Sequence, residues 1–183
     1  MFSRFFLGCA VMLGLASCVV TIVPESKSAD LPMPAPMAAD VPVKFAYLSY
    51  PVSTAKGLLH VAGVLRLPRD ANAPLPAVVI VHGSSGVDGR GQALAVELNR
   101  AGIATFEIDL WTPRGVKSPL ERPAHVNETL PDAYAAFQLL AARSDIDSQR
   151  IGITGFSWGG VVSMLAATRK YTEQYLGKDA KFA

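Results

Sequence analysis

The sequence is poor in cysteine. Only Cys9 and Cys18 occur among its 183 residues, and both lie in an apolar stretch at the N-terminus. The rest of the chain therefore contains no disulfide framework, no thiolate metal site and no cysteine nucleophile. It also shows no metal-ligand spacing and no phosphate-binding glycine loop, so we expect no bound metal.

Charge is also sparse. Charged residues make up 17% of the sequence, hydrophobic residues make up 50%, and the formal net charge is +2. The only basic run, Arg169-Lys170, falls at the end of a predicted helix, where cations suit the helix dipole. The lack of a basic stripe argues against nucleic-acid binding. A chain of this length and hydrophobicity predicts one domain with a substantial core.

The N-terminus has the pattern of an export signal, because Arg4 precedes an uncharged apolar run from Phe5 to Val20. The run contains Leu15-Ala16-Ser17-Cys18, which resembles a bacterial lipobox. The resemblance implies a signal peptide over residues 1–18 and lipidation of Cys18, and it predicts an exported periplasmic or outer-membrane-anchored lipoprotein. The alternatives are an uncleaved membrane anchor and cleavage without a lipid, which would leave a soluble secreted protein.

Residues 19–43 are rich in proline and alanine, which predicts an extended linker between membrane and domain. Residues 44–183 then form the domain. Strands are expected at 45–50 and 59–67, as an antiparallel edge pair in which Pro51 ends the first strand, and at 77–81, 103–109 and 150–155. Helices are expected at 91–100, 131–143 and 160–170. This alternation predicts an α/β fold with a mostly parallel sheet.

A Gly-x-Ser-x-Gly motif, Gly155 to Gly159, lies between the last predicted strand and a helix. In that context the serine occupies a strained turn that exposes its hydroxyl, and the amides of the following helix point at the developing oxyanion. Ser157 is thus the predicted nucleophile. The alternative is that Ser157 only caps the helix in a glycine-rich turn.

A second turn, His82-Gly83-Ser84-Ser85-Gly86, follows the first buried strand. In this architecture one oxyanion donor is the amide after the nucleophile and the other comes from this loop. The predicted donors are therefore Trp158 and Ser84, with Ser85 as the alternative to Ser84. The competing interpretation is a glycine- and serine-rich turn of purely conformational origin.

These two motifs, together with Asp109-Leu110 and the strand from Arg150, resemble the dienelactone hydrolase family over most of residues 44–183. The resemblance implies an α/β-hydrolase fold with helices on both faces of the sheet, no cofactor, and hydrolysis of small ester or lactone substrates through an acyl-enzyme. Dienelactone hydrolases proper use cysteine at the turn. Ser157 therefore points to serine-using, esterase-like relatives.

The family resemblance implies an acid and a histidine after the nucleophile, yet no histidine follows Ser157. His82 is expected to hold its turn, and His60 is expected on an edge strand away from the carboxyl ends of the sheet. His125, in the long loop near the site, is the only upstream candidate for a base. We expect instead that the chain is incomplete, that further strands carry the acid and histidine, and that residues 1–183 alone are poorly stable and nearly inactive.

The loop after Asp109 borders the expected crevice. Trp111 is a candidate pocket residue and Arg114 a candidate ligand for a substrate carboxylate, with loop packing as the alternative for both. Glu121, Arg122 and Glu128 are interpreted as surface charge. The predicted function is hydrolysis of carboxylic esters; the alternatives are a non-catalytic relic or anchored binding module, and a serine peptidase of the same fold. The sequence does not predict an oligomeric state.

Overall fold

The computed structural model describes residues 41–69 and 74–183. The chain divides into two units, Met1–Met37 and Ala38–Ala183. The predicted signal peptide, Cys18 and nearly all of the predicted linker lie outside the described residues. Among the described residues, no helix is long and apolar enough to cross a membrane.

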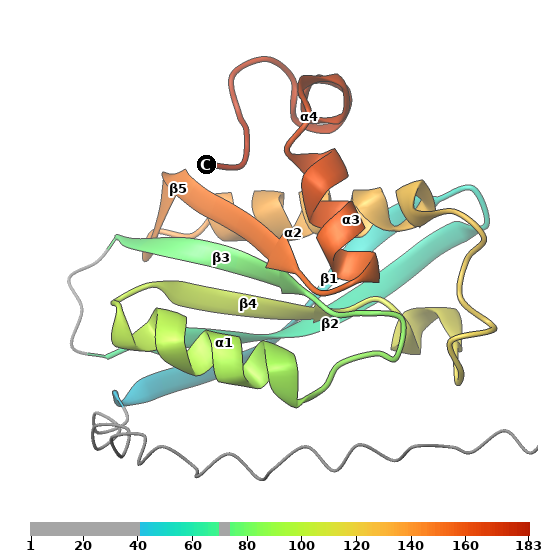
Figure 1. The fold of residues 1–183 in the computed structure, drawn as a ribbon. Coiled ribbons are helices and arrows are strands. Elements are labelled where there is room, and N and C mark those ends of the chain that lie inside the picture. The colour runs from blue at the N-terminus through green and yellow to red at the C-terminus, as the bar shows by residue number, and fades with distance from the viewer. Residues whose placement is uncertain (1–40, 70–73) are drawn as a thin grey trace, which may run out of the picture. The chain divides into compact units, whose positions relative to one another are not determined.

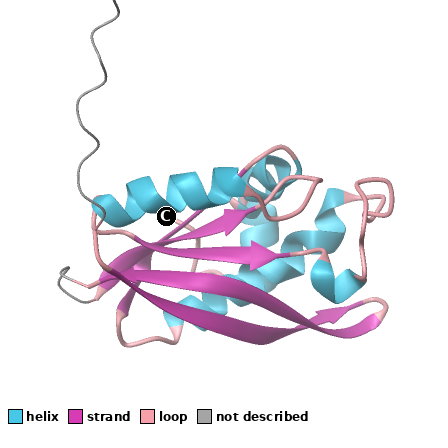
Figure 2. Cartoon of the chain, turned by 90° about the horizontal axis from the view of Figure 1, so that it is seen from below, coloured by secondary structure: helices cyan, strands magenta, loops and turns pink. Residues whose placement is uncertain are grey.

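The domain is built on one five-stranded sheet with the strand order β1-β2-β4-β3-β5 (Figures 1 and 2). Its strands are β1 (Val43–Thr54), β2 (Gly57–Pro68), β3 (Leu75–Val81), β4 (Ala104–Asp109) and β5 (Ile146–Gly155). Strand β3 is parallel to β4 and β5, whereas β2 is antiparallel to β1 and β4. The predicted α/β sheet with an antiparallel edge pair is confirmed.

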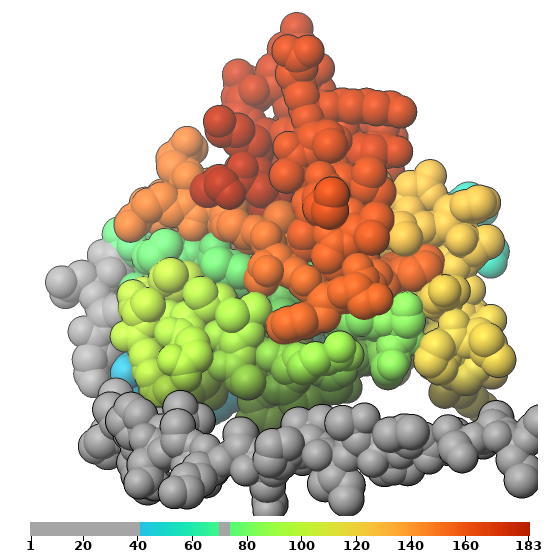
Figure 3. Space-filling model, viewed as in Figure 1, coloured from blue at the N-terminus to red at the C-terminus, as the bar shows by residue number. Residues whose placement is uncertain are grey.

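Helices cover both faces of the sheet. Helix α1 (Gly89–Arg100) lies on one face, and α2 (Leu130–Ala141) and α3 (Trp158–Ala166) lie on the other (Figure 1). Helix α4 (Arg169–Leu176) follows α3, and the two project from one side of the domain (Figure 3, orange to red). Strand β3 is apolar throughout because it is covered from both sides, and Val79, Ile80 and Val81 are fully buried.

Two 3-10 turns, η1 (Thr112–Arg114) and η2 (Val126–Thr129), lie in the long connection from β4 to α2, which the sequence predicted to be irregular. Residues 182–183 lie beside β5. The amide N of Ala183 donates to the Ile151 carbonyl at 2.9 Å, and Phe182 packs against Tyr134 and Phe137.

One predicted helix is wrong. The segment 160–170 is divided between α3 and α4, because Thr168 adopts an extended backbone conformation and its hydroxyl donates to the Leu165 carbonyl at 2.7 Å. The carbonyl of Ala166 at the end of α3 accepts hydrogen bonds from the hydroxyls of Tyr134 and Thr172 instead of continuing the helix.

Pro51 does not end the first strand, because β1 continues through it to Thr54. Among the described strands, β1 pairs with β2 alone. A proline in an edge strand removes no ladder hydrogen bond when its nitrogen faces solvent, and Pro51 is exposed.

Candidate active site at the carboxyl edge of the sheet

The strand register brings three loops to one edge of the sheet. Val81 of β3 lies opposite Ile108 of β4 and Gly155 of β5, so the three parallel strands end at the same level. His82 directly follows Val81, and Asp109 directly follows Ile108. Ligands of open α/β folds bind at this carboxyl edge.

Ser157 occupies the turn between β5 and α3 with φ 49° and ψ −107°. Among the described residues it is the only non-glycine residue with a positive φ. Such a backbone costs on the order of 1–3 kcal/mol and persists only where the surrounding structure enforces it. Ser157 is exposed, whereas its neighbours Trp158 and Gly159 are buried. The segment is neither a smooth strand nor a smooth helix, so the turn has the geometry that the motif predicted.

Two glycines make this turn possible. A Cβ at Gly155 would lie 2.6 Å from the Val81 carbonyl oxygen, and a Cβ at Gly159 would lie 2.1 Å from the same atom. The helix can therefore begin directly against the end of β3 only because neither residue has a side chain.

The second predicted motif lies against this turn. A Cβ at Gly83 would lie 3.7 Å from the Ser157 Cβ, so the loop after β3 passes directly beside the candidate nucleophile. The amide of Trp158 belongs to the first turn of α3, where amides have no partner within the helix. The residues predicted to donate to an oxyanion are thus placed on the two segments that flank Ser157.

His82 is buried and uses both ring nitrogens to hold the loop. Nδ1 lies 2.7 Å from the Gly83 carbonyl oxygen, and Nε2 accepts from the Leu110 amide at 3.0 Å. These partners place the proton on Nδ1 and leave Nε2 occupied. The distance of 3.8 Å from Nε2 to Asp109 Oδ1 is too long for a hydrogen bond. The predicted role of His82 as a holder of the turn fits these contacts.

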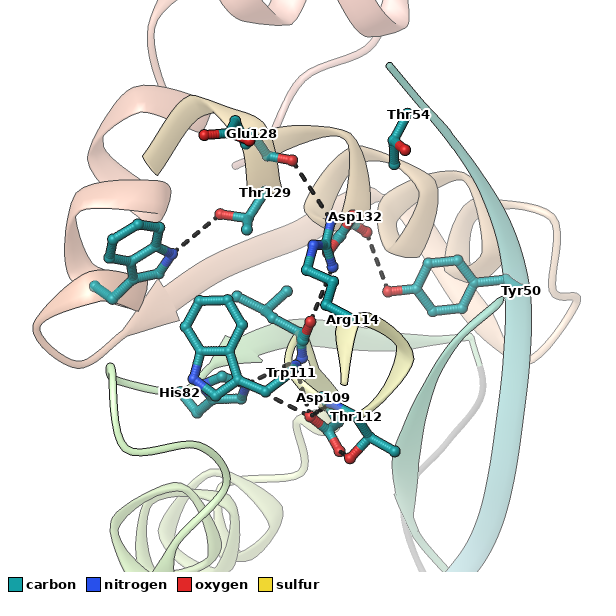
Figure 4. Close-up of polar contacts among 12 residues, drawn as sticks. Tyr50, Thr54, His82, Asp109, Trp111, Thr112, Arg114, Glu128, Thr129 and Asp132 are labelled. Carbon is teal, nitrogen blue, oxygen red and sulfur yellow. Dashed lines mark hydrogen bonds and ion pairs between the residues drawn. The ribbon is translucent and has the colours of Figure 1, made fainter. Parts of the chain in front are cut away.

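Asp109 caps the loop that leaves β4. Its carboxylate accepts from the backbone amides of Trp111 at 2.9 Å and Thr112 at 3.1 Å and from the Thr112 hydroxyl (Figure 4). Partial burial raises the pKa of the Asp109 carboxyl, whereas the hydrogen bonds from Thr112 and the Trp111 amide lower it. The net result is a pKa well below the ordinary value, so Asp109 is a structural anion at neutral pH.

Residues 61–177 match the model of the dienelactone hydrolase family. The chain belongs to this family. A relative from a Bradyrhizobium species, named "Probable 2-oxo-3-(5-oxofuran-2-ylidene)propanoate lactonase", is 31% identical over 101 residues, which are 51% of this chain and 41% of the relative. The family member described here therefore spans less than half of that protein.

Solved structures share the fold of this dienelactone hydrolase family member. A hyperthermophilic esterase from Pyrobaculum calidifontis aligns with a TM-score of 0.52 and 22% identity over 73% of this chain and 41% of the esterase. The esterase Est22 aligns with a TM-score of 0.55 and 21% identity over 73% of this chain and 40% of that chain. The predicted α/β-hydrolase fold is confirmed.

Trp111, a candidate pocket residue, lies beside the candidate site. With Ser84, Ser85, Asp109 and Lys117 it lines a hollow of about 260 Å³ beside the loop that follows β3. Its indole is 5% exposed, and its ring edge faces the ring of Trp158 with centroids 5.6 Å apart.

The contacts of Arg114 fit the loop-packing alternative and not the candidate role of substrate ligand. Its guanidinium makes two hydrogen bonds with the Asp132 carboxylate, at 2.7 and 3.0 Å (Figure 4), and Arg114 does not line the hollow. The Asp132 side chain is fully buried. Burial raises the pKa of this carboxyl, and Arg114 lowers it by less than that. Arg114 is thus committed to a buried ion pair and is not free to bind a substrate carboxylate.

Sequence reasoning missed Arg122. Its Nε lies 3.3 Å from the Ser84 hydroxyl, and its guanidinium carbon lies 5.0 Å from the centroid of the Trp158 ring. Arg122 therefore contacts both residues predicted to supply oxyanion donors, while remaining exposed. No local sequence signal marks it, because the loop from η1 to η2 determines where it lies.

The other two histidines, His125 and His60, lie directly before η2 and on β2. His125 is exposed at the start of η2, where its amide donates to the Glu128 side chain at 3.1 Å. The prediction that His60 lies away from the carboxyl edge is wrong, because Ala62 pairs with Asp109 and His60 therefore lies two residues past the end of β4. Strands β4 and β3 still separate β2 from β5. Among the described residues, no three His, Cys, Asp or Glu side chains form a metal-binding group.

Proposed function

We propose that the protein hydrolyses carboxylic esters or lactones through an acyl-enzyme formed on Ser157. The observation that carries this proposal is the turn at Ser157: an exposed serine held at φ 49°, at the carboxyl edge of the sheet, directly before a helix. Membership of the dienelactone hydrolase family supports it, and so does the lactonase named among the relatives.

In the proposed reaction the Ser157 Oγ attacks the ester carbonyl carbon, and its proton passes to a general base. The amides of Trp158 and Ser84 donate to the oxyanion, and each such donor is worth on the order of 10²–10³ in rate. Collapse of the intermediate breaks the bond to the alcohol oxygen, which leaves with the proton. Water then attacks the acyl-serine by the same route and releases the acid and free Ser157.

His82 is not suited to be the base, because both of its ring nitrogens are bonded to the backbone. The base of the proposed reaction is therefore a residue other than His82. A serine hydroxyl is a weak nucleophile without such a base.

The place of Arg122 supports a preference for esters that carry a negative charge. The Arg122 side chain is exposed and lies beside Ser84 and Trp158, the two proposed donors. Arg122 thus replaces Arg114 as the candidate ligand for a substrate carboxylate. A guanidinium binds a carboxylate with matched geometry. We expect Arg122→Ala to lower kcat/KM for an anionic ester such as a p-nitrophenyl hemisuccinate by about 10-fold, while a neutral ester is unaffected.

The test of the reaction uses the complete gene product and a fluorophosphonate probe together with p-nitrophenyl esters. We expect labelling at Ser157, identified by peptide mass spectrometry, and ester turnover that Ser157→Ala abolishes. Ser163→Ala is the matched control, because this hydroxyl lies on α3, the helix that begins directly after Ser157, and donates to the Gly159 carbonyl at 2.7 Å. If the folded protein shows neither labelling nor turnover, the proposed hydrolysis is rejected in favour of a non-catalytic relic or binding module. Cleavage of peptide anilides in preference to esters would favour the peptidase.

We also propose that the mature protein is an exported lipoprotein anchored through Cys18. The support is the charged start, the apolar run and the lipobox-like Leu15-Ala16-Ser17-Cys18. Mass spectrometry of the mature N-terminus is expected to find a diacylglyceryl-modified Cys18, and an unmodified cysteine on a secreted protein would reject the anchor.

A further inference from the structure

Trp111 joins the two segments that supply the proposed oxyanion donors. Its indole Nε1 donates to the Ser84 carbonyl oxygen at 3.0 Å. Its ring also meets the Trp158 ring edge-on, at 5.6 Å between centroids, and the His82 ring at 5.1 Å (Figure 4 shows Trp111 beside His82).

The hydrogen bonds of this loop fix the peptide units on both sides of Ser84. The Gly83 carbonyl is held by His82 Nδ1 at 2.7 Å and by the Gly86 amide at 3.1 Å. The Ser84 carbonyl is held by Trp111. In a trans peptide the N–H points opposite to the C=O of the same unit, so holding these two carbonyls sets the directions of the Ser84 and Ser85 amides.

We propose that Trp111 is a positioning residue that locks the oxyanion loop through the Ser84 carbonyl and fixes its distance from Trp158. The inference rests on the proposed function at Ser157. Trp111 touches no reacting atom in this scheme. The Ser84 carbonyl shares its peptide unit with the Ser85 N–H, so Trp111 directly holds the amide of Ser85, the alternative donor, and keeps it from turning away from the developing charge. The Ser84 amide is held through the Gly83 carbonyl by His82 and the Gly86 amide.

The kinetic test compares Trp111→Phe with Tyr134→Phe in the complete gene product. Phenylalanine keeps an aromatic ring but removes the donor to Ser84. Tyr134→Phe removes a buried donor of the same kind, from the Tyr134 hydroxyl to the Ala166 carbonyl at 3.0 Å, at the end of α3 remote from Ser157. A general loss of stability affects both variants, whereas loss of oxyanion positioning affects only the first.

For Trp111→Phe we expect kcat to fall about 10-fold with KM within about twofold of wild type, because the misplaced donor acts in the transition state and not in the ground state. Affinity for a trifluoromethyl ketone, which forms a tetrahedral adduct, is expected to fall by the same factor. Tyr134→Phe is expected to retain both values within about twofold. Equal losses in the two variants, or a Trp111→Phe enzyme with unchanged kcat, would overturn the proposal.

Two further measurements keep the inference testable if phenylalanine perturbs folding or the wild type proves inactive. Benzothienylalanine at position 111 keeps the bicyclic ring and replaces only the N–H by sulfur, so it should reproduce the loss in kcat. Amide hydrogen exchange should be faster at residues 83–86 in both variants at 111, and unchanged there in Tyr134→Phe. Unchanged exchange rejects the inference with or without activity. A wild type without Ser157-dependent turnover rejects the proposed function itself.

Discussion

Replacing Ser157 by glycine is expected to stabilise the protein while removing its proposed activity. The backbone at this residue has φ 49° and ψ −107°, a conformation that costs a residue with a Cβ about 1–3 kcal/mol. Glycine avoids that cost but loses about 0.5–1 kcal/mol through its greater freedom in the unfolded chain. The expected net gain is therefore about 1 kcal/mol, which corresponds to a rise in Tm of about 2–4 °C for a domain of this size.

Ser157→Ala is the matched variant for this measurement, because it removes the hydroxyl and keeps the Cβ. Urea unfolding followed by tryptophan fluorescence should give Ser157→Ala a midpoint close to that of wild type and Ser157→Gly a higher one, with equal m-values. Both variants lack the proposed nucleophile, so any difference between them reports the backbone alone. If Ser157→Gly is no more stable than Ser157→Ala, the turn is not strained and the argument from its geometry fails.

Three other substitutions test the surroundings of the site. Gly159→Ala should destabilise by about 3 kcal/mol or prevent folding, since its Cβ would lie 2.1 Å from a backbone oxygen, whereas Gly152→Ala, with its nearest contact at 3.6 Å, should cost less than about 1 kcal/mol in the same unfolding assay. Arg114→Ala should cost about 3–5 kcal/mol because it leaves a buried carboxylate uncompensated; the same change at the exposed Arg122 should cost less than about 1 kcal/mol, and equal losses would contradict the buried pair. Asp109, whose pKa is lowered in the fold, stabilises fully above the ordinary pKa of about 3.9 and progressively less as pH falls through its native pKa. Asp109→Asn should thus be less stable than wild type at pH 7, with a difference in unfolding midpoint that shrinks on acidification; a growing difference would reverse the sign of the argument.

The parts of the fold that the sequence predicted are those set by local pattern. The run at 77–81 is apolar without interruption and mostly β-branched, which is the composition of a strand covered on both faces. The glycines at 155 and 159 likewise indicated the turn, because their spacing around Ser157 is itself the steric requirement. Patterns of this kind carry their physical cause within a few residues.

The parts that the sequence did not predict depend on partners distant along the chain. The end of α3 is set by side chains that reach the Ala166 carbonyl from Tyr134, 32 residues away, and from Thr172. Arg114 forms its ion pair with Asp132, which lies 18 residues further along the chain. Arg122 contacts the hydroxyl of Ser84, which lies 38 residues earlier. A loop arginine has the same local signature whether it binds a buried carboxylate or faces a substrate, so only the folded chain separates the two roles.

The strain at Ser157 and the buried contacts around it form one physical system. An unfavourable backbone persists only if its surroundings stabilise the fold by more than it costs. Here the backbone of β3 meets Gly155 and Gly159 from one side, and Thr129 accepts from the Trp158 indole at 3.1 Å from the other. The turn is thereby fixed by the sheet and by the connection before α2, so the hydroxyl and the amides already hold the arrangement that the proposed reaction needs. That arrangement is what electrostatic preorganisation requires, because groups already aligned need not reorganise when charge develops.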